Sequence, residues 1–238
     1  MSNKTWLSWS SGKDSAWALH VLRQSGDYPV AGLFTTVNSA FNRVAMHAVR
    51  VELLRAQARA VGLPLYLIEI PYPCSNEQYA AAMTEFVAHA HEEGVRYFAF
   101  GDLYLEDVRR YREERLQGTG MAAIFPLWGR PTRELLSEML AGGLRACLTC
   151  VDPRSLPASF AGQELTQALL DSLPEGIDPC GENGEFHSFV FDGPMFDYPL
   201  DVEMGEVVER DGFVFADCRL RGSAVTAEPR QTVESGSK

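Results

Sequence analysis

Side chains suited to binding an anion stand together near the start of the chain, at Ser10, Ser11, Gly12, Lys13, Asp14 and Ser15. A β-type run precedes them and a helical pattern follows, so backbone N–H groups and a helix N-terminus would face the ligand. Gly12 lets the backbone approach a phosphate closely, and Lys13 adds a cation. Asp14 would repel phosphate unless Mg²⁺ lies between them. The segment therefore predicts a phosphate site with Asp14 on a magnesium ion.

Two other nucleotide-binding loops are excluded by the same residues. A Walker loop has glycine five residues before its Gly-Lys pair and serine or threonine after it, whereas this chain has Leu7 and Asp14 there. The spaced glycines of a dinucleotide-binding loop are also absent after this run. The remaining alternative is a serine-capped helix that carries Lys13 and Asp14 on its surface.

A second group of acid–base side chains lies far along the chain, in a glycine-rich stretch that holds Glu182, Asn183, Glu185 and His187. Two carboxylates and a histidine can bind a second Mg²⁺ or accept a proton, and a hydrophobic core has little use for them. The alternative is a structural turn. Cys180 beside them is interpreted as a small buried group rather than a nucleophile.

The pair Cys147 and Cys150 lies in a run that is typical of a buried strand, where alternation puts the two thiols on opposite faces. A zinc site would need a second pair at finger spacing, so we interpret both thiols as core packing. The five cysteines are scattered and odd in number, which predicts no disulfide framework and favours a reducing compartment.

Short β-type runs alternate with helical patterns over the first half of the chain, which predicts an α/β fold with a doubly wound parallel sheet. The expected strands cover 5–9, 30–37, 65–70, 97–100 and 124–128. The expected helices cover 13–23, 47–61, 76–93 and 106–115.

The pattern changes near Gly129, where we place a boundary between two domains. A helix over 131–141 and a strand over 144–151 are followed by frequent prolines and glycines. A hairpin over 206–210 and 213–220 is then predicted from its Asp211-Gly212 turn. We therefore predict a larger domain over 1–130, a smaller α+β domain over 131–223 and a disordered tail over 224–238.

The composition is that of an ordinary globular protein, with 46% hydrophobic and 22% charged residues. No run reaches the roughly 18 apolar residues of a membrane span, and the N-terminus carries no signal-peptide pattern. We therefore expect a cytoplasmic protein without a membrane partner. The net charge of −11 argues against a nucleic-acid partner, although the basic stretch 109–112 could form a local patch.

The Ser-Ser-Gly-Lys-Asp-Ser segment resembles the Ser-Gly-Gly-Lys-Asp-Ser loop of the N-type ATP pyrophosphatases, which are adenine nucleotide alpha-hydrolases of the HUP or PP-loop type. Ser11 stands where that loop usually has glycine, and a positive φ there would cost energy in serine. Further stretches resemble one branch, the diphthine–ammonia ligase (diphthamide synthesis) family and its bacterial-type relatives. These stretches are 46–50, 62–65, 101–103 with Arg109 and Glu113, 126–128, 178–187 and 192–196. Leu116 departs from the resemblance, because a cysteine often follows that helix in the family.

The resemblance spans nearly residues 5 to 220 and implies a reaction. Members of the superfamily cleave ATP between its α- and β-phosphates and transfer AMP to an acceptor oxygen. Members of the branch adenylate the carboxylate of diphthine, and ammonia then displaces AMP to form an amide. We therefore expect a ligase that uses ATP, Mg²⁺, ammonia and a carboxylate acceptor, which is a protein or a small molecule. The alternatives are a tRNA-thiolating PP-loop enzyme and a non-catalytic ATP-sensing module. The sequence does not decide the oligomeric state, for which a homodimer is one possibility.

The resemblance also implies roles for particular residues. The expected catalytic residues are Lys13, Asp14, Glu182, Glu185 and His187, with Asp14 as the metal ligand. The expected nucleotide-binding residues are Ser10, Ser11, Gly12, Lys13, Asp14, Ser15, Thr35, Thr36, Val37, Gly101 and Asp102. The expected substrate-binding residues are His47, Arg50, Arg109, Glu113 and Asn183.

Each of the remaining expected site residues also has a structural interpretation. Asp102 could cap the helix that follows it, and Arg109 with Glu113 has the i, i+4 spacing of a surface ion pair. The stretch 35–37 could be a plain buried strand end, and His47 with Arg50 a solvated helix start.

Overall fold

The structure is a computed structural model that describes residues 3–38, 43–44 and 49–222. His47, which we expected at the acceptor side, lies outside the described residues, and so does the expected tail over 224–238.

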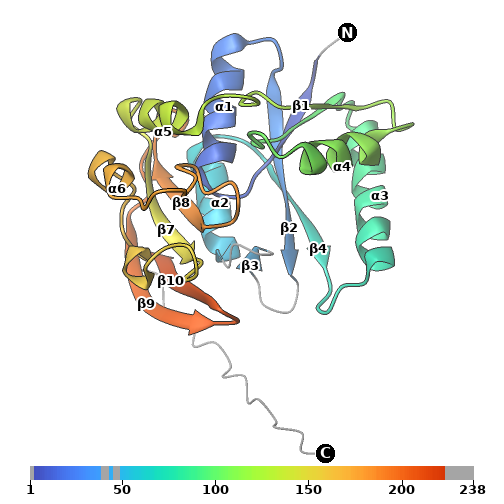
Figure 1. Cartoon of the computed structure of the whole chain (residues 1–238). Helices are drawn as coiled ribbons and strands as arrows, with labels where there is room; N and C mark the ends of the chain where they lie inside the picture. The colour runs from blue at the N-terminus through green and yellow to red at the C-terminus, as the bar shows by residue number, and fades with distance from the viewer. Residues whose placement is uncertain (1–2, 39–42, 45–48, 223–238) are drawn as a thin grey trace, which may run out of the picture.

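Five parallel strands form the larger sheet in the order β4-β2-β1-β5-β6 (Figure 1). Their bounds are β1 Thr5–Ser8, β2 Val30–Asn38, β4 Leu65–Ile70, β5 Tyr97–Ala99 and β6 Ala122–Ile124. A short antiparallel strand, β3 (Arg43–Val44), pairs with the end of β2. The strands that follow β1 in sequence are added first on one side of it, as β2 and β4, and then on the other side, as β5 and β6. The carboxyl end of β1 is therefore a topological switch point, where open α/β sheets bind ligands.

Helices cover both faces of this sheet, which confirms the predicted doubly wound fold. Their bounds are α1 Lys13–Ser25, α2 Val51–Ala60, α3 Asn76–Glu92 and α4 Glu106–Leu116. Apolar side chains of α1 and α2 belong to one buried cluster, and those of α3 and α4 belong to another that includes Trp6 and Phe34. Strands enclosed in this way are apolar on both faces, as the continuous apolar run of β2 predicts.

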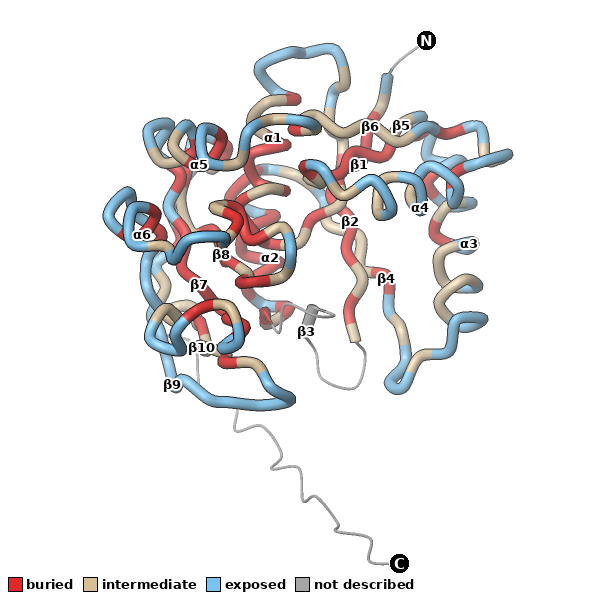
Figure 2. The backbone as a smooth tube through the Cα atoms, viewed as in Figure 1, coloured by how far each residue is buried: buried red, intermediate tan, exposed pale blue. Residues whose placement is uncertain are grey.

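A second, antiparallel sheet of four strands lies beside α1 and α2, in the order β8-β7-β10-β9. Its strands are β7 Arg145–Val151, β8 Phe186–Asp192, β9 Val202–Arg210 and β10 Phe213–Leu220. The helices α5 Thr132–Ala141 and α6 Gln167–Asp171 and the 3₁₀ turn η1 Ala158–Phe160 complete this part. Buried residues continue from α1 and α2 into β7 and β8, so the two sheets share one core (Figure 2).

Three expected elements differ from the structure by four residues at one end, and a further strand was missed. The strand expected over 124–128 is β6 and ends at Ile124, because Pro126 lacks an N–H group and the chain turns, with Trp128 N donating to Phe125 O at 3.2 Å. The helix expected from residue 47 begins at Val51, since Arg50 is extended. Strand β9 begins at Val202 rather than at residue 206. Strand β8 was missed, because its first residues belong to a stretch that we interpreted as a loop.

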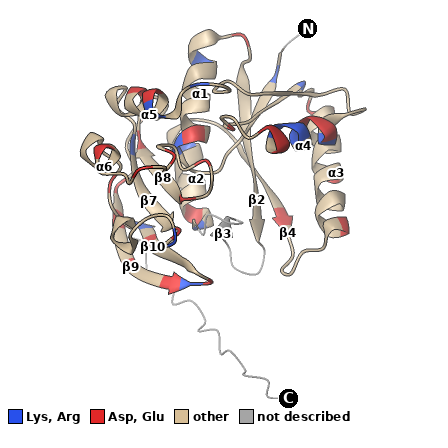
Figure 3. Cartoon of the chain, viewed as in Figure 1, with Lys and Arg blue, Asp and Glu red and all other residues tan. Residues whose placement is uncertain are grey.

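Two expectations about the surface can be compared with the described residues. Among the described helices, none is both long and apolar enough to cross a membrane. The basic stretch 109–112 lies on α4, where acidic and basic side chains mix, so it forms no purely basic patch (Figure 3).

Candidate active site

The loop between β1 and α1 occupies the switch point of the parallel sheet, and its backbone is held from outside. Ser11 adopts a positive φ of 71°, which glycine takes without cost and serine does not. The carbonyl of Ser11 accepts hydrogen bonds from Val190 N on β8 and from the side chain of Gln57 on α2, both at 3.0 Å. The second sheet and α2 therefore both fix the conformation of this loop.

Hydroxyl groups close the loop from within. Ser10 Oγ and Ser15 Oγ lie 3.1 Å apart and share a hydrogen bond, and Gly12 N donates to Ser10 Oγ at 3.3 Å. Ser15 Oγ donates to Gly12 O at 3.0 Å. Gly12 itself is extended, and a Cβ there would lie 3.2 Å from Ser188 O, so this glycine is needed for close approach rather than for a positive φ.

Gln57 is fully buried behind the loop and uses its whole amide group. Its oxygen accepts from Trp9 Nε1 at 2.8 Å, and its nitrogen donates to Ser11 O at 3.0 Å and to Val190 O at 2.6 Å. Each bond reaches a different element: the end of β1, the loop and β8. Gln57 therefore joins the two sheets at the place where the loop turns, a role that the sequence analysis did not predict.

Lys13 is buried at the start of α1 and is held by protein groups on several sides. Its Nζ donates to Asp14 Oδ2 at 2.8 Å and to the carbonyl of Cys180, and lies 5.4 Å from the centre of the Phe186 ring. Burial alone would lower the pKa of Lys13, but Asp14, Cys180 and Glu182 together outweigh it, and the pKa lies above its usual value. The amine is therefore a fixed charge at neutral pH.

The segment after β5 approaches the first turn of α1 very closely. A Cβ on Gly101 would lie 2.8 Å from the carbonyl carbon of Asp14 and 2.9 Å from Ser15 N, so only glycine fits there without a backbone shift. Asp102 next to it does not cap α4, whose N-cap is Leu105 without a side-chain bond, so that interpretation is wrong. Its carboxylate instead pairs with Arg112 on α4.

The stretch before β8 is a compact loop organised around a buried carboxylate. Glu185 accepts hydrogen bonds from Asp178 N and Asn183 N, both at 3.0 Å, and from Asn183 Nδ2 at 3.1 Å. Glu182 N donates to Asp178 Oδ2 at 2.9 Å, while the Glu182 side chain points out of the loop and accepts from Leu103 N at 2.9 Å. Glu185 and Asn183 therefore shape the loop that presents Glu182.

Burial shifts the pKa values of three titratable side chains: Glu182, His187 and Cys180. Burial raises the pKa of Glu182 to about 7, so this carboxyl group changes charge near neutral pH. Burial, reinforced by the positive charge of Lys13, lowers the pKa of His187 to about 4, so its imidazole is neutral at pH 7. The pKa of the Cys180 thiol is raised by burial, and its Sγ lies 3.4 Å from Thr132 O, which suits a structural thiol.

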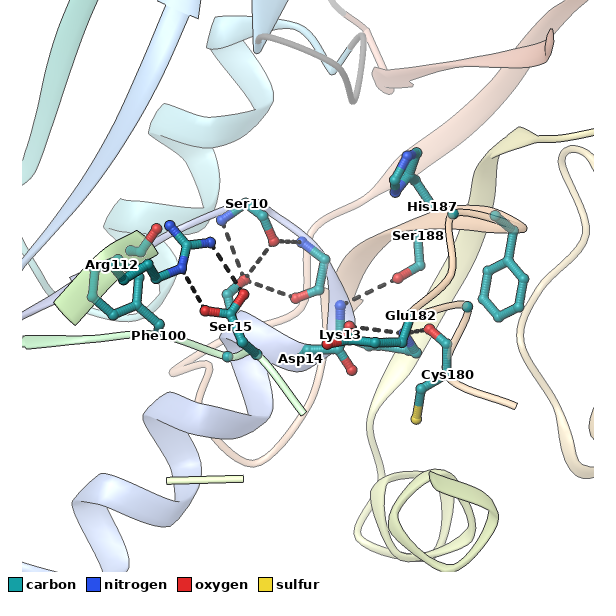
Figure 4. A pocket seen from close by; sticks show the side chains of 17 residues that line it. Ser10, Lys13, Asp14, Ser15, Phe100, Arg112, Cys180, Glu182, His187 and Ser188 are labelled. Carbon is teal, nitrogen blue, oxygen red and sulfur yellow. Dashed lines mark hydrogen bonds and ion pairs between the residues drawn. The ribbon is translucent and has the colours of Figure 1, made fainter. Parts of the chain in front are cut away.

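These segments meet around one cavity of about 220 Å³. The loop between β1 and α1 lines it with Ser10, Gly12, Lys13, Asp14 and Ser15. The segment after β5 contributes Gly101 and Asp102, and the second sheet with the loop before it contributes Glu182 and His187. Figure 4 shows Ser10 and Ser15 between Arg112 and Phe100 at one end and Glu182, Cys180 and His187 at the other. Residues about 170 positions apart therefore share one polar site.

Other expected site residues lie outside the lining of this cavity. Thr35, Thr36 and Val37 belong to β2 beyond Phe34, the residue opposite the last residue of β1. Arg50 pairs with Asp217 of β10 through two bonds of 3.1 and 3.0 Å. Arg109 and Glu113 form the surface ion pair, at 2.9 Å, with the Arg109 guanidinium 4.8 Å from the centre of the Trp128 ring. Asn183 and Glu185 bond within their own loop.

Among the residues of the site that the sequence analysis missed, three make informative contacts. Arg112 lines the cavity, and so does Ser188, whose Oγ accepts from Lys13 N at 3.2 Å. Gln57 holds the loop from behind. Arg112 lies three residues after Arg109, so the two side chains are neighbours on one face of α4. This spacing is the one feature of the sequence from which a role of Arg112 at the site could have been predicted. Nothing in the sequence distinguishes Gln57 or Ser188 from surface residues.

The thiols of Cys147 and Cys150 are both buried in β7, as core packing predicts. All five cysteines of the chain are free thiols. The described residues contain no group of three or more His, Cys, Asp or Glu side chains that could hold a metal ion, so the Cys147 and Cys150 pair has no zinc partners there.

The fold defines the class: an α/β protein with a doubly wound parallel sheet and a smaller antiparallel-sheet domain. Sequence comparison then identifies the family. The profile of the diphthamide synthase N-terminal domain matches residues 3–122, and that of the diphthamide synthase C-terminal domain matches residues 131–217. The chain belongs to the diphthamide synthase family.

Curated relatives of this chain are named diphthine–ammonia ligase. The Danio rerio protein is 32% identical over 181 residues, which cover 67% of this chain and 68% of that protein. The Homo sapiens protein is 26% identical over 231 residues, or 87% of this chain and 85% of that protein. The Bos taurus protein is 32% identical over 118 residues, which cover 47% of this chain but only 44% of that protein. The relatives are named as enzymes, and the similarity to the Homo sapiens protein covers most of this chain.

Proposed function

We propose that this chain is an ATP-dependent ligase that adenylates a carboxylate acceptor, releases pyrophosphate and lets ammonia displace AMP to form an amide. Its relatives are named as ligases that join diphthine and ammonia. The observation that carries the proposal is the shared cavity, in which the loop 10–15 faces the carboxyl group of Glu182 and the imidazole of His187. A phosphate site and an acid–base site then lie within reach of one bound substrate.

We propose that the loop 10–15 binds the phosphates of ATP. The N–H groups at the start of α1 and the charge of Lys13 suit an anion. Gly12 lets β8 pack closely against this loop. Adenine would then lie along β2, where Thr35, Thr36 and Val37 continue beyond the end of β1. Gly101 would flank the ribose or the phosphates, because it contacts the first turn of α1.

We propose Asp14 as a ligand of Mg²⁺. Its Oδ1 is buried and has no hydrogen-bond partner among the described residues, while Oδ2 pairs with Lys13. A buried carboxylate oxygen without a donor is costly, and a bound cation would satisfy it. The residues present therefore fit the metal, which would neutralise phosphate charge when bound.

We propose that Glu182 accepts the proton that ammonia loses on attack. Its pKa of about 7 suits a group that must be partly deprotonated at neutral pH and still hold a proton afterwards. His187, which is neutral at this pH, would accept a hydrogen bond from ammonia or from the acceptor. Glu185 and Asn183 would keep Glu182 in place, because they form the loop that presents it.

The acceptor itself is proposed only as a carboxylate, with diphthine as one candidate. Arg50 forms an ion pair with Asp217, and Arg109 forms one with Glu113. For either arginine to bind the acceptor, its ion pair must open; with the pair closed, the arginine can act only by holding the neighbouring backbone in place. We also propose a cytoplasmic location, which suits a chain with five free thiols.

The products of the reaction test this function. The purified protein with ATP, Mg²⁺, ammonium and a carboxylate acceptor should form AMP and pyrophosphate in equal amounts, together with the amide. ADP and phosphate as products would exclude adenylation. Lys13→Ala should lose the activity, and its circular dichroism spectrum should confirm that the variant is folded.

A further inference from the structure

Arg112 reaches the cavity from α4, a helix that buries only Leu116. The guanidinium lies 4.3 Å from the centre of the Phe100 ring, and its Nε and Nη2 both donate to the Asp102 carboxylate. Two contacts of this kind hold a long side chain in one orientation, so Arg112 is arranged in advance rather than free to rotate.

The pairing with Asp102 uses only one edge of the guanidinium. Because Nε and Nη2 make the contact, the other edge keeps an N–H of Nη2 and an N–H of Nη1 side by side. No described residue accepts a hydrogen bond from Nη1, and the side chain is 30% exposed. Two parallel N–H groups match two oxygens of a phosphate or a carboxylate.

The charges of the cavity indicate which anion this edge suits. Lys13 and Arg112 are the two Lys or Arg side chains in the described lining, against the carboxylates of Asp14, Asp102 and Glu182. Lys13 is already bound to Asp14 and to the Cys180 carbonyl. An extended polyphosphate needs more positive charge than one engaged lysine supplies, and the serines of the loop lie between the two cations (Figure 4).

We propose that Arg112 binds phosphate oxygens, of ATP and of the pyrophosphate that leaves, and that Asp102 is the residue that positions it. The inference rests on the proposed function and adds the second cation of the phosphate site. It also assigns Asp102 an indirect role in nucleotide binding, because its carboxylate holds the Arg112 guanidinium in place. The role belongs to Arg112 rather than to Arg109, whose guanidinium pairs on the surface.

Binding of inorganic pyrophosphate and of ATP, each with Mg²⁺, tests the proposal by titration calorimetry. Arg112→Gln should weaken both by about 10- to 100-fold, as the loss of a charge-assisted double hydrogen bond predicts. Arg112→Lys should recover part of the loss, because it keeps the charge without the fork. Arg110→Gln is the matched control: it removes an exposed arginine of the same helix that does not line the cavity.

The role of Asp102 is tested by Asp102→Asn, which keeps the shape and removes the charge. Pyrophosphate affinity should fall by less than in Arg112→Gln, with the melting temperature near that of the wild type. Unchanged affinity for both anions in Arg112→Gln would overturn the inference, and a rise confined to the KM of the acceptor would assign the guanidinium to a carboxylate instead. A wild-type protein that binds neither anion would refute the proposed function, and this inference with it.

Discussion

Burial raises the pKa of Glu182, a carboxyl group of the cavity, to about 7, so its charge changes near neutral pH. Below this pH the group is protonated and cannot accept a proton, so the amidation rate at constant free ammonia should rise as the pH increases through 7. Glu182→Gln should remove this dependence and lower the rate by about 10²- to 10⁴-fold. A variant that keeps the same pH profile would show that another group is the base.

Ser11 holds a positive φ and a buried hydroxyl without a hydrogen-bond partner among the described residues. Glycine removes both costs, so Ser11→Gly should raise the free energy of unfolding by about 1 kcal/mol. Urea denaturation measures this change, and ATP affinity should stay near that of the wild type because the backbone path is the same. A destabilised variant would mean that the hydroxyl has a role that the loop geometry does not reveal.

At the residue scale, the sequence predicts which side chains meet but not which way each one points. Lys13, Asp14, Glu182 and His187 do line one cavity, because the loop motif and the glycine-rich stretch carry residue types with few other uses. Glu185 lies within that stretch, yet its carboxylate turns inward to bind loop N–H groups. Glu182 and Glu185 lie three positions apart in this loop and point in different directions, and no periodicity of the sequence indicates this.

The elements α2 and β8 hold the loop through Gln57, whose three hydrogen bonds are all buried. Gln57→Leu keeps the volume but removes the partner of Trp9 Nε1 and one hydrogen bond each to Ser11 O and Val190 O, so the free energy of unfolding should fall by about 2–4 kcal/mol. ATP affinity should fall as well, because Ser11 loses a partner. Leu54→Ala is the control: it removes a buried side chain of the same helix and should cost similar stability without weakening ATP binding.

Elements with strong periodicity or clear stop signals could be predicted from the sequence, and the others could not. Strand β4 has the predicted bounds, since Gly62 and Pro64 precede its apolar run. Strand β8 was missed because its partners in the antiparallel sheet, not its own short pattern, make it a strand. The position of Ser188 in the cavity depends on that pairing, so it could not be predicted either.

At the scale of the whole molecule, the two sheets share one buried cluster and meet at the loop, although the predicted boundary near Gly129 divides them along the chain. Two parts that share a core should unfold together, so calorimetry should show a single transition whose van't Hoff and calorimetric enthalpies agree. ATP with Mg²⁺ should raise the temperature of that transition. Two separate transitions, with only the first shifted by ATP, would mean that the smaller domain contributes little to the site.

The proposed chemistry depends on the loop 10–15 binding the phosphates of ATP, and the position of a bound nucleotide tests this most directly. A crystal structure with Mg²⁺ and a non-hydrolysable α,β-methylene analogue of ATP should show the β- and γ-phosphates against the start of α1. Lys13 should contact them, and Asp14 should bind the metal ion. A nucleotide bound elsewhere, with the loop 10–15 unchanged and empty, would contradict the phosphate site and the ligase built on it.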